Sequence, residues 1–435
     1  MEKLYFFDET FYWGRSGKRA TAIEVECELT QNVNPDELRT AVLGALRVHR
    51  NFRARPIIVG RRFFVDTSEA KQVTVVREDG QPRSLGSKET EGLMIYVSYG
   101  ESRFTLHLFH GLGDMRSICA FLHTVLKFYC HTVDDSQLAT DSMDTFPCHE
   151  HILGGGAPSR GLQIPDSGKY IPQEHDIFHL PEELFSTTTT RQRIIDIDLP
   201  IAPLLAFARE NGSSVIPALN AIVGRVIRQC YDVGQKEIVC YCPIDLRPVF
   251  HFKTGGNGAI PFSIPYTAET DRLPLGERAR RLRAELKVQT RPENLYTTVA
   301  QLRADFDQIF AAPQPVTEVS PMVVKSGREK DSANNTYGIS YAGHLDFGDA
   351  IAQQVKTVSV SAGSYSYPLW IIACEYKGII RMRLVQSFES DRLATAIHQE
   401  LVALFPGTTY TDRGLHDFDS FPLANVPSKD NNTIL

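Results

Sequence analysis

The chain has 435 residues, of which 42% are hydrophobic and 23% charged, with a formal net charge of -6. This composition is typical of a globular protein, and the length suffices for two domains of about 200 residues. The acidic balance argues against a primary role in nucleic-acid binding, and no apolar run approaches the ~18 residues of a membrane span.

The first half of the chain contains patterns of both helices and strands. Asn34-Pro-Asp-Glu-Leu38 has a capping residue, a proline in the first turn and acids near the positive end, which predicts the start of a helix. Apolar residues at every second position of 104–109 predict a strand, whose apolar face would carry His110 inward if the strand continued. Helical spacing from Met115 to Tyr129 places a helix start at Asp114.

The second half has a similar mixture of patterns. A helix is expected over 215–227, a strand over 237–246 and another helix over 277–289. Leu369–Cys374 and Ile379–Val385 are predicted to form a hairpin joined at Lys377-Gly378. A closing helix from Asp391 to Phe405 is expected to be capped by Ser390.

The domain joint is expected where turn-forming residues accumulate. Gly154-Gly-Gly-Ala-Pro-Ser159 and Ser186-Thr-Thr-Thr-Thr190 are rich in glycine, proline, serine and threonine. We therefore place the boundary near residue 180, which gives domains 1–180 and 181–435. The beginning of the chain lacks the apolar core of a signal peptide, so we expect a cytoplasmic protein. The eight cysteines of the whole chain form no CxxC pair, and we expect them to be reduced thiols.

His110-Gly-Leu-Gly-Asp114 is an HxxxD pentad between the predicted strand and the predicted helix. A second copy, His131-Thr-Val-Asp-Asp135, has no strand in front of it, so the first pentad is the candidate. Two simpler interpretations exist: Asp114 can be only a helix cap, and His110 only a hydrogen-bonded core residue. Further motifs are needed to choose between these interpretations.

Five ordered motifs resemble those of the chloramphenicol acetyltransferase-like superfamily, which includes condensation domains of peptide synthetases, alcohol acyltransferases and the plant BAHD enzymes. The motifs are Val48-His-Arg-Asn-Phe-Arg53, Phe109-His-Gly-Leu-Gly-Asp-Met-Arg-Ser117, Pro243-Ile-Asp-Leu-Arg-Pro248, Gly256-Asn257 and Ile339-Ser-Tyr-Ala-Gly343. The resemblance implies an α/β fold of two chloramphenicol acetyltransferase-like subdomains, each a mixed sheet with helices, around a central solvent tunnel.

Several positions depart from the patterns of the individual subfamilies. Phe109 stands where condensation domains have the first histidine of HHxxxDG, and Met115 replaces the glycine after the aspartate. Tyr341 occupies the usual place of an asparagine, and Asp346-Phe-Gly-Asp349 shares only three letters with the plant DFGWG motif. The chain is therefore not assigned to one subfamily.

The resemblance also implies roles for particular residues. His110 is expected to act as the general base, while Asp114 points away from the acceptor and forms an ion pair with Arg247. Gly111 and Gly113 permit close approach of the backbone, and Asn257 is a supporting residue near the loop. Removal of a proton by a positioned base contributes roughly 10²- to 10⁴-fold to the rate of such a reaction.

The predicted function is transfer of an acyl group from a coenzyme A or carrier-protein pantetheine thioester to an alcohol or amine. The thioester is a co-substrate, and no tightly bound cofactor is expected. The expected partners are a small-molecule acceptor and acyl-coenzyme A or an acyl carrier protein, and a monomer is favoured. The alternatives are a stand-alone condensation domain acting on carrier proteins and a non-catalytic binding member of the superfamily.

Metal binding is the main chemical alternative. Cys148-His-Glu-His151 and His175-Asp-Ile-Phe-His179 supply clustered ligand types, the second pair of histidines at i,i+4 spacing. The surrounding prolines and glycines indicate loops rather than a helix that would bring these side chains to one face. We therefore expect no metal site.

Overall fold

The computed structural model describes residues 2–4, 6–15, 17–20, 22–132, 176–185, 191–251, 255–363 and 367–429. The two segments predicted to form the domain joint, 154–159 and 186–190, lie outside these residues. So do Asp135 of the second pentad and the possible metal ligands Cys148, His149, His151 and His175.

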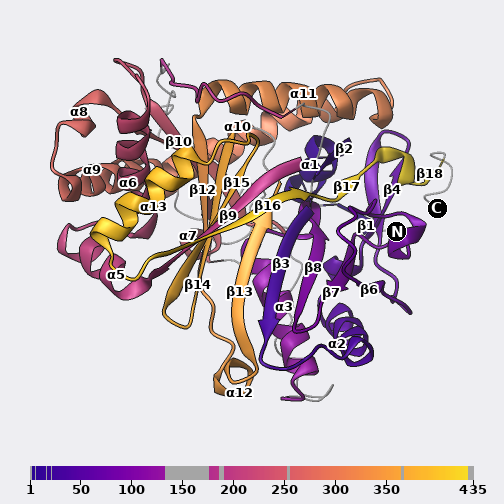
Figure 1. Cartoon of the computed structure of the whole chain (residues 1–435). Helices are drawn as coiled ribbons and strands as arrows, with labels where there is room; N and C mark the ends of the chain where they lie inside the picture. The colour runs from indigo at the N-terminus through magenta and orange to yellow at the C-terminus, as the bar shows by residue number, and fades with distance from the viewer. Residues whose placement is uncertain are drawn as a thin grey trace.

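Two mixed sheets form the centre of the molecule (Figure 1). The larger sheet has seven strands in the order β11 (Ala259–Tyr266), β10 (Ile238–Asp245), β12 (Tyr337–His344), β14 (Leu369–Tyr376), β15 (Ile379–Gln386), β9 (Arg191–Pro200) and β16 (Thr409–Asp417). The smaller sheet has five strands in the order β13 (Val355–Ala362), β3 (Ala22–Leu29), β8 (Arg103–Phe109), β7 (Ile95–Tyr99) and β6 (Val75–Arg77). The predicted α/β class with two mixed sheets is confirmed.

Two small sheets extend the first half. One has the order β1 (Glu2–Lys3), β5 (Arg62–Asp66), β4 (Arg55–Val59) and β18 (Ser428–Lys429), and the other pairs β17 (Ser420–Phe421) with β2 (Gly17–Ala20). Short 3-10 turns lie between strands and helices: η1 (Arg50–Arg53), η2 (Lys88–Thr90), η3 (His110–Leu112) and η6 (Leu423–Asn425).

Helices cover the outer faces of both main sheets. The five-stranded sheet shares its core with α2 (Pro35–Val48) and α3 (Met115–Tyr129). The seven-stranded sheet shares its core with α5 (Ile201–Glu210), α6 (Val215–Cys230), α9 (Leu275–Gln289) and α13 (Arg392–Leu404). The remaining helices are α1 (Phe6–Arg15), α7 (Arg247–Phe250), α8 (Ala268–Asp271), α10 (Pro292–Phe310), α11 (Val316–Asn334) and α12 (Asp349–Ala352). Within the described ranges, no helix is both long and apolar enough to cross a bilayer.

Local capping and turn chemistry explain several of these elements. The side chain of Asn34 accepts hydrogen bonds from the backbone N–H groups of Asp36 and Glu37, as expected for a helix cap. Lys377 and Gly378 have φ values of 52° and 78°, which is the turn geometry that matches the twist of a hairpin. The predicted hairpin, the strand at 237–246 and the closing helix are confirmed, but the cap residue of the helix is Asp391 and not Ser390. The Oγ of Ser390 accepts a hydrogen bond from the backbone N–H of Arg392 at 3.3 Å.

The second half of the chain contributes strands to the sheets of the first half. Strand β13 belongs to the second half of the sequence but pairs with β3 along its whole length, from Val355 with Leu29 to Ala362 with Ile23. After β16, the chain returns to the first half, where β17 and β18 complete the small sheets. The boundary near residue 180 remains a prediction, and strands β13, β17 and β18 of the second half belong to sheets of the first half.

A buried polar cluster connects β3, β7 and β8 with the segment after β16. His107 lies 2.8 Å through Nδ1 from Oδ2 of Asp419 and 2.8 Å through Nε2 from Oγ of Ser98. His416 contacts Oε1 of Glu24 at 2.8 Å. Burial by itself lowers the pKa of His107, but Asp419 and Glu24 outweigh it and raise this pKa to about 9. The cluster therefore ties the last part of the chain to the five-stranded sheet by charge.

This cluster predicts that stability falls at alkaline pH. The pKa of His107 is about 9 in the folded protein, whereas an ordinary histidine has a pKa of 6.5. The cluster therefore contributes to the free energy of unfolding fully below pH 6.5, and this contribution is lost as the pH rises through 9. The shift corresponds to about 3 kcal/mol of unfolding free energy. The raised pKa of His416 acts in the same direction. Urea unfolding from pH 6 to 10 measures how much unfolding free energy is lost. The unfolding free energy should fall less with rising pH in His107→Gln than in the wild type. An equal fall in the two proteins would contradict the assignment to His107.

Candidate active site

His110 is placed by the end of a strand rather than by its continuation. Strand β8 ends at Phe109, and η3 begins at His110. The strand does not continue, as the expectation required, so strand alternation does not determine the direction of His110. Both faces of β8 are already buried, and the turn directs the half-buried imidazole into a cavity of about 610 Å³. Residues from both halves of the chain line this cavity, as the predicted central tunnel requires.

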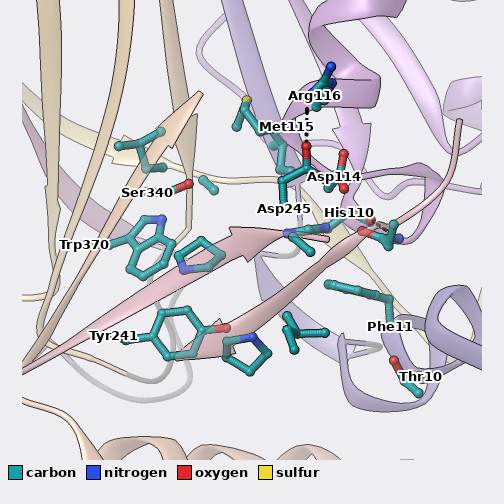
Figure 2. A pocket seen from close by; sticks show the side chains of 18 of the residues that line it. Thr10, Phe11, His110, Asp114, Met115, Arg116, Tyr241, Asp245, Ser340 and Trp370 are labelled. Atoms are coloured by element: carbon teal, nitrogen blue, oxygen red, sulfur yellow. Dashed lines mark hydrogen bonds and ion pairs between the residues drawn. The ribbon is translucent and has the colours of Figure 1, made fainter. Parts of the chain in front are cut away.

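The imidazole of His110 is stacked on an aromatic ring from the beginning of the chain. Phe11 of α1 lies with its ring centroid 4.3 Å from that of His110 and with an interplanar angle of 23°. Figure 2 shows the two rings together at one side of the pocket. Stacking of this kind restricts the orientation of the imidazole. No local signal predicts this contact, because 99 positions separate the two residues and α1 has no motif.

Asp114 points away from the cavity centre and holds the loop. It caps α3, where its Oδ1 accepts from the backbone N–H of Ser117 at 3.1 Å. Its carboxylate also forms a buried, two-point ion pair with Arg247, at 2.7 Å and 3.2 Å. The backbone N–H of Gly258 donates to Oδ2 at 2.7 Å. The predicted ion pair is present, and the helix-cap interpretation is also correct.

Arg247 joins both halves of the chain through further contacts. Its guanidinium donates to the carbonyl of Gly256 at 2.8 Å, to Oγ of Ser117 at 3.0 Å and to Oδ1 of Asp245 at 3.0 Å. Burial alone lowers the pKa of Arg247, but Asp114 and Asp245 outweigh this and raise it. The guanidinium therefore keeps its charge while it holds the pentad against the loop that precedes β11.

Asn257 connects the pentad to α1. Its Nδ2 donates to the backbone carbonyl of His110 at 3.3 Å and to Oδ1 of Asp8 at 3.0 Å. Its backbone N–H donates to the same oxygen of Asp8 at 2.9 Å. Burial raises the pKa of Asp8 to about 6, although the hydrogen bonds from Asn257 lower it. Asp8 was not identified from the sequence, because its partner lies 249 positions away.

Asn51 fixes the other side of the same loop. It lies in the motif Val48-His-Arg-Asn-Phe-Arg53, in the turn that follows α2. Its Nδ2 donates to the carbonyls of Leu112 at 2.7 Å and Gly255 at 2.6 Å. The motif therefore contributes to the site through an amide that bridges the two halves.

Two glycines are required by the packing of the loop. A Cβ added at Gly111 would overlap the fully buried ring of Phe109. A Cβ at Gly113 would lie 2.9 Å from Cβ of Ser117 and 3.0 Å from the carbonyl oxygen of Gly255. The two glycines named from the sequence thus permit close approach, although neither has a left-handed φ.

We expect Gly111→Ala to destabilise the protein by about 1–3 kcal/mol, because either the ring or the loop must move. Urea unfolding measures this change. Gly327→Ala in α11 is the control, since its Cβ would meet nothing within 4 Å and alanine favours a helix. A Gly111→Ala protein as stable as the control would show that the loop adapts without cost.

The cavity has a polar side and an aromatic side. His110, Asp245 and Arg116 lie on the polar side, where Arg116 of α3 and Asp245 of β10 form an ion pair at 2.9 Å across the two halves (Figure 2). Tyr241 and Trp370 from the seven-stranded sheet lie on the other side (Figure 2). A mostly apolar pocket with a few polar groups at one place is typical of a site for a small molecule.

A metal could be held at one place among the described residues. Ligand-type atoms of Glu24, His107 and Asp419 lie within 4.8 Å of one another. These atoms are already hydrogen-bonded or ion-paired within the polar cluster, and Tyr96 donates to Asp419 at 2.9 Å. The cluster is therefore satisfied by its own charges, and it does not line the cavity.

The architecture is shared with solved structures, whereas no protein-family model and no curated protein matches the sequence. Polyketide synthase associated protein 5 from Mycobacterium tuberculosis matches with a TM-score of 0.60 and 14% identity, over 93% of this chain and 98% of that one. TRI101 of F. sporotrichioides, complexed with coenzyme A and T-2, matches with a TM-score of 0.57 and 12% identity, over 94% and 99%. The condensation domain of the Monacolin K polyketide synthase MokA matches with a TM-score of 0.58 and 10% identity, over 93% and 96%.

These matches cover nearly the whole length of each chain, so the similarity concerns the complete architecture and not one subdomain. The chain has the fold of the chloramphenicol acetyltransferase-like superfamily. The resemblance inferred from the five motifs is confirmed at the level of the fold.

Proposed function

We propose that the chain is an acyltransferase that moves an acyl group from a coenzyme A or carrier-protein pantetheine thioester to an alcohol or amine. The observation that carries the proposal is the position of His110. Its imidazole lies in the cavity between the two halves, while the carboxylate of Asp114 is turned away onto Arg247. The imidazole is thus presented to a substrate, and Asp114 holds the loop.

His110 removes the proton of the acceptor hydroxyl or amine as that atom attacks the thioester carbonyl. The tetrahedral oxyanion then collapses, the carbon–sulfur bond breaks, and the imidazolium returns the proton to the departing thiolate. Positioned proton transfer of this kind contributes roughly 10²- to 10⁴-fold. No covalent enzyme intermediate is required.

The other residues named from the sequence act on the loop. Asp114 and Arg247 fix its position, Gly111 and Gly113 allow its tight packing, and Asn257 holds the backbone carbonyl of His110. Phe11 restricts the imidazole by stacking. These are positioning roles.

The solved structures support a thioester donor. TRI101 has the same fold and was complexed with coenzyme A, and MokA contributes a condensation domain. Coenzyme A and carrier proteins present the same pantetheine arm, so one cavity can accept either donor. A stand-alone condensation reaction on carrier proteins would use the same base.

The test is release of free thiol from acyl-coenzyme A and acyl-pantetheine thioesters, with pooled alcohols and amines as acceptors. Acceptor-dependent release that requires His110 supports the proposal, and the better donor distinguishes free coenzyme A from carrier-bound substrates. If release is equal in wild type and His110→Ala, or absent with both donor types, a non-catalytic binding function is favoured instead.

A further inference from the structure

Three aromatic rings form a continuous surface on the side of the cavity opposite His110. The ring centroid of Tyr241 lies 5.0 Å from that of Tyr367 and 5.5 Å from that of Trp370, and the ring is tilted by 38° and 55° to these two rings. Tyr367 and Trp370 are stacked at 5.6 Å with an interplanar angle of 24°. All three residues line the cavity, and we call them the aromatic floor.

A glycine makes room for the indole ring of this floor. Tyr241 of β10 is paired with Gly338 of β12, and Gly338 is paired with Trp370 of β14, so the three residues form one row across the sheet. A Cβ at Gly338 would overlap the indole ring of Trp370. The indole therefore lies over the glycine backbone, in the space that any other side chain at position 338 would fill.

Most of the described residues that share the cavity with the floor carry no charge, although the carboxylate residue Asp331 of α11 also lines the cavity. Ser340, Tyr341, Ala342, Ala362 and Ile372 line the cavity beside it. Burial raises the pKa of Tyr341 to about 12, so this hydroxyl is neutral at physiological pH. On the opposite side, the charges of Asp114 and Asp245 are already paired with arginines. Such surroundings disfavour an unpaired charge on the group that lies against the floor.

We propose that the substrate carries a neutral, flat aromatic or fused ring system that stacks on the aromatic floor, with its reacting group directed towards His110. This inference rests on the proposed acyl transfer and names the class of its substrate. Stacking on aromatic rings adds to apolar burial a contribution of about 2- to 12-fold in affinity. The ring system belongs either to the acceptor or to the acyl group, and turnover experiments separate these two sources.

Binding of two matched probes tests the floor directly. We expect 2-naphthol to bind the wild-type protein at least about 3-fold more tightly than decahydro-2-naphthol, which has the same carbon skeleton but is not flat. The charged 2-naphthoate should bind more weakly than 2-naphthol. Isothermal titration calorimetry measures all three. Equal affinities for the flat and the non-flat alcohol, or no binding of any probe at millimolar concentration, would overturn the proposal.

Variants test whether the aromatic floor causes the tighter binding of 2-naphthol over decahydro-2-naphthol. Trp370→Leu should lose this preference for 2-naphthol, whereas Trp370→Phe should keep most of it. Gly338→Ala should also lose the preference, because the indole must move although all three rings remain. Tyr410→Leu is the matched control, since Tyr410 belongs to the same sheet but does not line the cavity. If Trp370→Leu does not fold by circular dichroism, Tyr241→Leu takes its place. A preference that survives in the folded variants would contradict the proposal.

Turnover separates this proposal from the function on which it rests. One arm combines acetyl-coenzyme A with 2-naphthol or decahydro-2-naphthol, and the other combines 2-naphthoyl- or decahydronaphthoyl-coenzyme A with small alcohols. Faster His110-dependent turnover of the flat member in one arm supports the proposal and shows which substrate carries the ring. His110-dependent turnover without such a preference rejects the ring system only. A binding preference without His110-dependent turnover supports the floor and rejects acyl transfer.

Discussion

Replacing His110 with alanine is expected to lower acceptor-dependent thiol release at least 100-fold, and by up to about 10⁴-fold. The side chain lies in the cavity, and its loss removes the group that accepts the proton of the attacking hydroxyl or amine. The loss should appear in kcat, with KM little changed, because the base acts mainly in the transition state. The rise of kcat/KM with pH that a general base produces should also disappear in the variant.

The second pentad supplies a matched control for this substitution. His131 has the same HxxxD spacing, but it is exposed, follows α3 and has a φ of 52°. Asparagine tolerates this backbone conformation, so His131→Asn should leave both stability and thiol release unchanged. A loss in His131→Asn similar to that in His110→Ala would mean that the choice between the two pentads was wrong. Circular dichroism of both variants excludes unfolding as the cause.

The parts of the fold that could be predicted are those with a local signal. The strand at 103–109, the loop and the helix from Met115 are each marked by periodicity, glycines and a capping residue within a few positions. The hairpin at Lys377-Gly378 follows from turn chemistry alone. The partnership of Asp114 and Arg247 came from the resemblance, since no local pattern links residues 133 positions apart.

Long-range contacts account for what the sequence did not disclose. Asp8 and Phe11 act on the pentad from a helix that contains no motif. Nothing in the residues of strand β13 indicates pairing with β3 in the other half. The aromatic floor depends on the register of three strands, which places Tyr241, Gly338 and Trp370 in one row. Such registers are set by the whole sheet and not by a local pattern.

Breaking the ion pair between Asp114 and Arg247 is expected to cause a large loss of stability, because Arg247 carries a buried charge between the two halves. Asp114→Ala would remove one of the two carboxylates that are ion-paired with Arg247 among the described residues, and Asp245 would remain. Breaking a buried ion pair from one side typically costs about 3–5 kcal/mol of unfolding free energy. We expect a loss of this size by urea unfolding, together with loss of thiol release, because the pentad is no longer held against Gly256 and Gly258.

The geometry predicts that the two substitutions at this ion pair are not additive. Arg247→Met alone leaves the carboxylate of Asp114 buried, with hydrogen bonds from the backbone of Ser117 and Gly258. Combining it with Asp114→Asn removes both charges, so the double variant should be more stable than the sum of the losses measured for Arg247→Met and Asp114→Asn singly predicts. Arg39→Ala is the matched control, since its ion pair with Asp36 is exposed and should contribute little. Additive losses in the double variant, or a control loss as large as that of Arg247→Met, would show that Asp114 and Arg247 support the fold independently and not as a pair.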